Sequence, residues 1–363
     1  MPGSALFIAA VTKRSSSPVP RVLPMLVLAA ASLPFEAAHA QQYKLFKDWV
    51  VGCDNRRTCT VLGLPAQDAG DQAAFIRLVR EGAAEALPAI ELVYASENPM
   101  EGTALELAID GQPVAGLVAG PIAAKGDGYT VRAGLGAAES MNFIVALRNA
   151  KSATLHLLER GKSAGEVRTV SLAGSAAALL FVDAQQKRDG GVTALVGRGK
   201  APASAVPPPP ELPVVASLSI EELDQPLPPL PAGVPTVKDA SCPGEQPLAL
   251  RLGGGATLWG ICDSAGAYNF GFRMYLARQG AAQLQHFDLP GEKPDAVLVN
   301  PGVMEDRRTL NSFNKGRGPG DCGDSADWVW NGTTFKLLRY STLKECRGVP
   351  SDDWPQVYTS RRQ

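Results

Sequence analysis

Two sequence patterns could support nucleophilic catalysis, and both also have a structural interpretation. Gly161-Lys-Ser-Ala-Gly165 matches the G-x-S-x-G elbow that exposes the nucleophilic serine of many hydrolases. That elbow requires a strand followed by a helix, whereas here the motif joins two predicted strands, so we interpret it as a hairpin connection. His156 and His286, which could act as a general base, lie in alternating segments and are expected on the solvent faces of strands.

Paired carboxylates could support a second kind of hydrolysis. Asp321 and Asp324 lie in a glycine-rich segment, and Asp352 and Asp353 are adjacent in the chain. Two carboxylates can act as acid and base wherever the fold brings them together. Acidic side chains in such loops more often cap turns by accepting hydrogen bonds from backbone N–H groups, which is the interpretation we favour. A hydrolase with paired carboxylates is the alternative function.

The glycine-rich loop from Lys315 to Gly323 has the spacing that most suggests ligand binding. Alternating glycines allow positive φ angles and can direct successive backbone N–H groups to one point, while two basic side chains add positive charge. These features predict a small anion site formed by Lys315, Arg317, Gly318 and Gly320. Its ligand would be phosphate, a carboxylated peptide or an acidic glycan. The competing interpretation is a surface loop held by Cys322, because the loop has no Walker spacing and no helix is expected after it.

The six cysteines indicate disulfides formed in an oxidising compartment. Cys53 and Cys59 precede a proline-rich segment and the other four cysteines follow it. If the two parts fold separately, Cys53 must pair with Cys59. The remaining four can pair in three ways, and we favour Cys242 with Cys262 and Cys322 with Cys346. Because the chain has no Cys-x-x-Cys motif and few histidines, we expect no metal and no cofactor.

The composition and the N-terminal sequence indicate the compartment of the protein and exclude one class of partner. The chain has 363 residues with 35 basic and 36 acidic side chains, a balance that argues against a nucleic-acid partner. Basic residues precede an apolar stretch at residues 22–33, and Ala38-His-Ala40 has small residues at the positions read by signal peptidase. We expect a signal peptide at residues 1–40, cleaved after Ala40, and a periplasmic protein. The apolar stretch is too short to span a bilayer, so we expect no transmembrane anchor.

A proline-rich segment divides the rest of the chain. Residues 200–239 contain eleven prolines, which predicts a semi-rigid extended linker. Within it, Ser219–Glu222 has capping-box spacing and predicts one helical turn. The predicted organisation is an α+β domain at 41–199, the linker at 200–239 and a mostly β domain at 240–363. The fold class is therefore α+β, with two β-rich, disulfide-containing domains.

Hydrophobic periodicity predicts the elements of both domains. In the first domain we expect antiparallel strands at 44–53, 59–64, 74–80, 90–95, 104–109, 113–118, 153–157 and 167–172, and helices at 137–149 and 173–188. In the second, residues 268–276 alternate as a strand packed on one side. Asn331-Gly332, between two apolar runs, predicts a tight hairpin.

Motifs in both domains resemble known bacterial families. Phe46–Cys59 and Ser171–Ala178 resemble the invasion-associated locus B proteins of Gram-negative bacteria. The second domain resembles the domain-of-unknown-function family 1176 through four motifs, at Gly266–Asn269, Lys315–Gly323, Trp328–Gly332 and Cys346–Pro355. The second resemblance is the more specific because several rare clusters occur in order. It implies an exported protein and carries over no catalytic residues.

The sequence leads to one function and one alternative. We expect a periplasmic protein without enzymatic activity, which binds an unknown envelope protein or glycan, or maintains the envelope. A specific form is a protein inhibitor of an envelope-degrading enzyme such as lysozyme, because a disulfide-fixed loop can enter the cleft of its target. The alternative is a periplasmic hydrolase that uses paired carboxylates.

Overall fold

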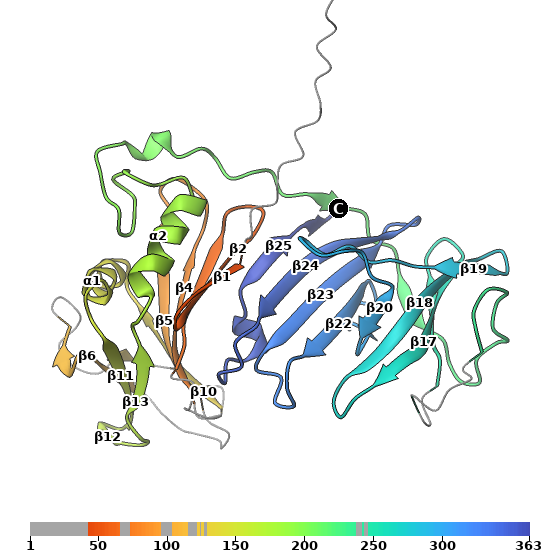
Figure 1. Cartoon of the computed structure of the whole chain (residues 1–363), viewed down its shortest axis with the longest axis horizontal. Coiled ribbons are helices and arrows are strands. Elements are labelled where there is room, and N and C mark those ends of the chain that lie inside the picture. The colour runs from red at the N-terminus through yellow and green to blue at the C-terminus, as the bar shows by residue number, and fades with distance from the viewer. Residues whose placement is uncertain are drawn as a thin grey trace, which may run out of the picture. The chain divides into compact units, whose positions relative to one another are not determined.

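The structure is a computed structural model and describes residues 43–65, 73–95, 104–114, 122–123, 125–126, 129–236, 242 and 246–363 (Figure 1). The predicted signal peptide, residues 1–40, lies outside these residues. We call residues 43–199 the N-terminal half and residues 246–363 the C-terminal half. Within residues 39–363 the chain forms one compact unit.

The N-terminal half is built on a seven-stranded antiparallel sheet, which we call the first sheet. Its order is β1 (Tyr43–Phe46), β2 (Trp49–Cys53), β3 (Cys59–Gly63), β4 (Ala74–Arg80), β5 (Ala89–Ala95), β10 (Thr130–Leu135) and β9 (Lys125–Gly126). The sequence predicts one strand over 44–53. The structure instead has a hairpin there, because the chain turns at Lys47, whose φ is 55°.

A second antiparallel sheet and two helices complete this half. The sheet contains β12 (Lys162–Ser163), β11 (Ser152–Glu159), β6 (Ala104–Ile109) and β7 (Gln112–Pro113), with β13 (Arg168–Ser171) paired to β11 and β8 (Ile122–Ala123) paired to β6. The helices are α1 (Ala137–Leu147) and α2 (Ser175–Gln185), both predicted from the sequence.

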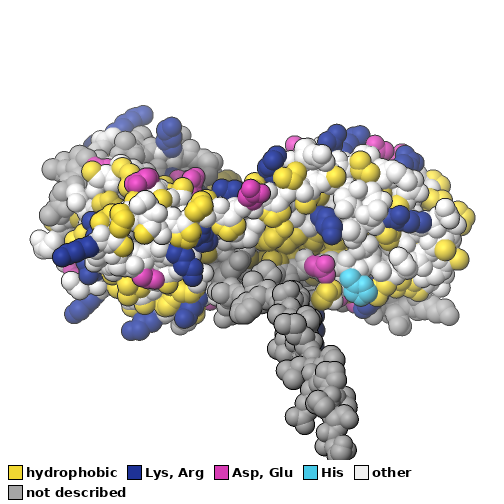
Figure 2. Space-filling view, turned by 90° about the horizontal axis from the view of Figure 1, so that it is seen from above, with side chains coloured by type: hydrophobic (Ala, Val, Ile, Leu, Met, Phe, Trp, Pro, Cys, Tyr) yellow, Lys and Arg dark blue, Asp and Glu magenta, His cyan; other side chains and the backbone are white. Residues whose placement is uncertain are grey.

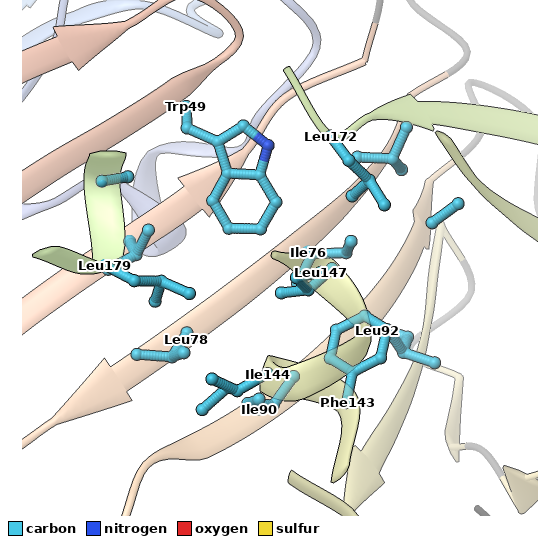
Figure 3. Close-up of a cluster of buried hydrophobic side chains, with 14 of the residues drawn as sticks. Trp49, Ile76, Leu78, Ile90, Leu92, Phe143, Ile144, Leu147, Leu172 and Leu179 are labelled. Carbon is cyan, nitrogen blue, oxygen red and sulfur yellow. The ribbon is translucent and has the colours of Figure 1, made fainter. Parts of the chain in front are cut away.

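One core joins the first sheet to α1 and α2. Trp49 from β2, Leu92 from β5, Phe143 from α1 and Leu179 from α2 converge in it, and all are inaccessible to solvent (Figure 3). The Trp49 indole N–H donates to the Ser171 carbonyl at 2.9 Å. Because the apolar side chains of each element are buried in this core, the elements form where the apolar periodicity of the sequence predicts them.

The C-terminal half is a sandwich of two antiparallel sheets. One contains β16 (Leu248–Leu252), β17 (Ala256–Ala265), β18 (Phe270–Arg278) and β19 (Ala281–Leu284), with β20 (Val297–Val299) on β18. The strand β15 (Ile220–Glu222), from the preceding proline-rich segment, pairs with β16 at the edge of this sheet. The other, the last sheet, contains β21 (Gly302–Val303), β22 (Thr309–Lys315), β23 (Gly323–Trp330), β24 (Phe335–Leu343) and β25 (Gln356–Thr359). Leu258 and Met274 of one sheet pack with Trp328 and Trp330 of the other. The predicted Asn331-Gly332 hairpin connects β23 to β24.

The proline-rich segment is held against both halves. It contains η1 (Ala203–Ala205), β14 (Val214–Val215) and β15, and β14 pairs in parallel with β26 (Arg361–Arg362). Arg57 of the N-terminal half donates to the carbonyls of Pro207 and Pro208. The helical turn predicted at Ser219–Glu222 is wrong, because Ile220 is buried in the sandwich core and its segment pairs with β16.

These elements confirm the α+β, mostly β fold class. Three disulfides constrain the fold. They join Cys53 to Cys59, Cys242 to Cys262 and Cys322 to Cys346, the pairing favoured from the sequence. Neither α1 nor α2, the α-helices of the described residues, combines the length and apolar character that crossing a membrane requires.

Candidate functional site

The glycine-rich loop between β22 and β23 is fixed at several points. Cys322 anchors it to Cys346, and the Asn269 side chain binds both the N–H and the carbonyl of Lys315. Gly323 has a φ of 136°, and a Cβ there would lie 1.9 Å from the Asn314 carbonyl oxygen, so only glycine fits. The loop is therefore pre-organised.

Within this loop the backbone N–H groups of three residues bind protein atoms. The N–H of Lys315 donates to Asn269 Oδ1, that of Gly316 to the Cys322 carbonyl and that of Gly320 to the Arg317 carbonyl. These groups do not converge on one point as an anion site would require. These three N–H groups are therefore already occupied and are not available to an anion.

The charged side chains of the loop have defined partners. Arg317 forms an ion pair with Asp321, with Nε–Oδ1 and Nη2–Oδ2 distances of 2.7 and 2.6 Å. Burial acts to raise the pKa of Asp321, but Arg317 and the Gly348 N–H together hold it below its usual value. Lys315 Nζ lies 6.0 Å from the centre of the Phe313 ring. Gly318 lies beside Tyr268, whose hydroxyl donates to the Gly316 carbonyl.

The four aspartates singled out in the sequence have different surroundings. Asp321 is bound to Arg317, and Asp353 to Arg132. Asp324 accepts from Asn314 Nδ2 at 3.0 Å, and burial raises its pKa. Asp352 is exposed and lines a pocket. The structure does not gather these four carboxylates into one acid–base pair.

A polar pocket of about 440 Å³ lies on the face of the last sheet that points away from the sandwich core. Two rows of side chains cross its strands. In the first row Asn311, Asp327 and Arg339 are register partners on β22, β23 and β24. The second row, two residues along, contains Phe313, Ser325, Ser341 and Gln356. The sequence did not predict this pocket, although the alternation of polar and apolar residues within each strand can be seen in it.

Ser163, His156 and Glu106 have the connectivity of a serine-hydrolase triad. Ser163 Oγ lies 2.9 Å from His156 Nε2, and His156 Nδ1 lies 3.5 Å from Glu106 Oε2. In a nucleophile elbow the N–H after the serine stabilises the oxyanion. Here that N–H, from Ala164, donates to the Leu157 carbonyl at 2.9 Å, as expected for a hairpin. The hairpin interpretation of this motif therefore explains the contacts.

The motif Cys346–Pro355 contacts the N-terminal half. Val349 and Trp354 pack on the apolar face of the first sheet, against Val50, Leu62, Leu64, Phe75 and Val93. Arg347 Nη1 lies 2.7 Å from Asp48 Oδ1, and Asp353 binds Arg132. Gly52 allows this approach, since a Cβ there would lie 2.4 Å from the Pro355 Cβ. We call residues 346–355 the docking segment.

Other features of the surface are less specific. A pocket of about 270 Å³ lies between the first disulfide loop and Pro209, lined also by Arg56 and Glu81. On the face drawn in Figure 2, basic and acidic side chains are interspersed with apolar ones. Among the described residues no group of three or more His, Cys, Asp or Glu side chains is arranged to hold a metal ion.

Comparisons with known proteins extend over both halves. The chain matches the model of a family described as "Protein of unknown function (DUF1176)" over residues 43–361, so the match includes the N-terminal half. The uncharacterized protein YpfG of Escherichia coli K12 is 30% identical over 354 residues, which cover 90% of this chain and 94% of YpfG. Invasion associated protein B from Bartonella henselae has a crystal structure that matches 40% of this chain and 98% of its own, with 17% identity and a TM-score of 0.29. The chain therefore belongs to the DUF1176 family.

Proposed function

We propose that this protein is an exported, periplasmic binding protein that acts on the cell envelope through recognition rather than catalysis. The observation that carries the proposal is the rigidity of the Lys315–Gly323 loop, which a disulfide, an ion pair and the Asn269 side chain all restrain. A rigid exposed loop loses little conformational entropy when it binds, which favours tight recognition. Three disulfides support export to an oxidising compartment.

A specific form of this proposal is inhibition of an envelope-degrading enzyme such as lysozyme. The loop would enter the cleft of its target, with Lys315, Arg317 and Gly318 as the contact residues. Gly320, which the sequence also suggested, is buried and would only support the loop. The test compares peptidoglycan lysis by lysozyme with and without the purified protein, residues 41–363. Lysis slowed by the wild-type protein and restored by Arg317→Ala would support inhibition, and unchanged lysis would contradict it. Arg251→Ala, which removes an exposed arginine elsewhere, is the matched control.

The alternative is a periplasmic hydrolase that uses two carboxylates. One observation favours it, since Asp327 and Asp352 line the same polar pocket. The same assay without lysozyme separates the two functions. Release of soluble fragments by the protein alone, lost in Asp327→Asn, would support the hydrolase and contradict a role limited to binding.

A further inference from the structure

We propose that the polar pocket of the last sheet binds a saccharide that is neutral or bears amino groups. The pocket volume of about 440 Å³ lies within the range of about 300–1,000 Å³ typical of small-molecule sites. This inference rests on the proposed binding function for its choice of ligand class, but none of the residues that line the pocket belongs to the glycine-rich loop.

The first row of the pocket is a pre-organised hydrogen-bonding set. Asp327 is only 6% exposed, and its carboxylate accepts from Asn311 Nδ2 at 2.7 Å and from Arg339 Nε at 2.9 Å. These bonds fix the carboxylate without enclosing its partner, because the Arg339 side chain is 55% exposed. Fixed polar groups of this kind recognise ligands without a large cost of ordering.

The second row provides groups that both donate and accept hydrogen bonds. Ser325 and Ser341 offer hydroxyls, and Gln356 offers an amide. Sugar hydroxyls also donate and accept, so a saccharide can satisfy such a surface in both roles. The two rows lie across four adjacent strands, spaced about 4.8 Å apart, which gives an extended platform rather than a point contact.

One end of the platform has an apolar surface. The half-buried Phe313 ring stacks on Trp354, with ring centres 5.6 Å apart and an angle of 29° between the planes. The exposed Met304 also lines the pocket. A sugar ring has an apolar C–H face as well as hydroxyls, and an aromatic ring held in place by its neighbour suits that face.

The charge of the lining selects among saccharides. Asp327 and Asp352 carry two negative charges and Arg339 one positive charge, so the pocket is negative overall. Like charges across a binding surface oppose association, whereas a neutral or amine-bearing sugar meets no such repulsion. The glycine-rich loop has the opposite character, so the two surfaces would take different ligands.

Isothermal titration of the full mature chain tests the proposal with three probes. These are tetramers of N-acetylglucosamine, of glucosamine and of galacturonate, which are neutral, cationic and acidic. We expect saturable binding of at least one of the first two, and binding of galacturonate weaker by at least about tenfold. Absence of saturable binding for all three probes, or a preference for galacturonate, would overturn the proposal.

Variants locate the binding to the pocket. Arg339→Ala and Gln356→Ala, from different rows, should each weaken binding of the neutral N-acetylglucosamine tetramer, the first by at least about tenfold because a charged hydrogen-bonding group is lost. For the glucosamine tetramer Gln356→Ala is the test, because Arg339→Ala also removes a charge that repels this probe. Gln356→Ala removes no charge and keeps the test valid if Arg339→Ala does not fold. Arg251→Ala and Arg317→Ala should bind as the wild type does. Unchanged affinity in both pocket variants would overturn the proposal, whereas loss of lysozyme inhibition alone in Arg317→Ala would concern only the loop.

Discussion

The carboxylate of Asp353 accepts hydrogen bonds from both Nη atoms of Arg132, at 2.9 and 2.7 Å, and so joins η2 (Ser351–Asp353) to β10. Arg77 Nε lies 3.4 Å from the same carboxylate. The Asp353 side chain is 4% exposed, so two arginines of the N-terminal half depend on one buried acid of the docking segment.

Asp353→Ala should destabilise the protein by about 3 kcal/mol, because it removes the buried carboxylate that both Arg132 and Arg77 approach. Urea unfolding followed by circular dichroism measures the change. Glu221→Ala, which removes an exposed partner of Arg251, should change stability by less than about 0.5 kcal/mol. Equal stability of Asp353→Ala and wild type would contradict a docking role for this pair.

The three disulfides should differ in their contribution to stability according to the loop that each closes. Replacing Cys322 and Cys346 with serine opens a separation of 24 residues and should cost about 3 kcal/mol, whereas replacing Cys53 and Cys59 opens one of 6 residues and should cost about 2 kcal/mol. Denaturant midpoints of the two double variants measure the difference. The reverse order would show that loop length does not govern these contributions.

Asp324 should make stability depend on pH. Burial raises the pKa of Asp324, so the folded state retains a proton that the unfolded chain releases. Wild-type stability therefore falls as pH rises from the unfolded pKa of about 3.9 through the raised folded value. Asp324→Asn removes this loss. Its melting temperature relative to wild type should be higher near pH 7 than near pH 3.

Asp306 provides a control of opposite sign. Partial burial acts to raise its pKa, but the Arg308 N–H, Arg362 and the Thr309 hydroxyl lower it to about 2. The stability that this aspartate contributes is present above its unfolded pKa and is lost as pH falls toward about 2. Asp306→Asn should therefore lower the melting temperature near pH 7. If both variants shifted the same way, the assigned environments would be wrong.

Ser163 should not be a catalytic nucleophile. Because the Ala164 N–H is bound to the Leu157 carbonyl, no oxyanion can form against it without breaking the hairpin. We expect no covalent labelling by a fluorophosphonate, measured by mass spectrometry of the intact protein. Labelling lost in both Ser163→Ala and His156→Gln would overturn this interpretation.

Local signals predicted many elements, and long-range packing decided the rest. β4 matches its predicted bounds because residues 74–80 form a short, mainly apolar run with aromatic and β-branched side chains, which is typical of a buried strand. Ser219–Glu222 has helical capping residues, yet Ile220 gains more by burial in the sandwich. The polar pocket escaped prediction for a similar reason. Its two rows depend on the long-range pairing of β22, β23, β24 and β25, which no local pattern encodes.

The docking segment covers the second apolar face of the first sheet, which includes Val50, Leu62 and Phe75. Synthesis proceeds from the N-terminus, so the strands of that sheet, within residues 43–135, are made well before residues 346–355. Before residues 346–355 are made, this face of the sheet is an exposed apolar surface, of the kind that chaperones and proteases recognise. A chain that stops before Trp354 lacks a side chain that packs on this face, so Val50, Leu62 and Phe75 lose part of their cover.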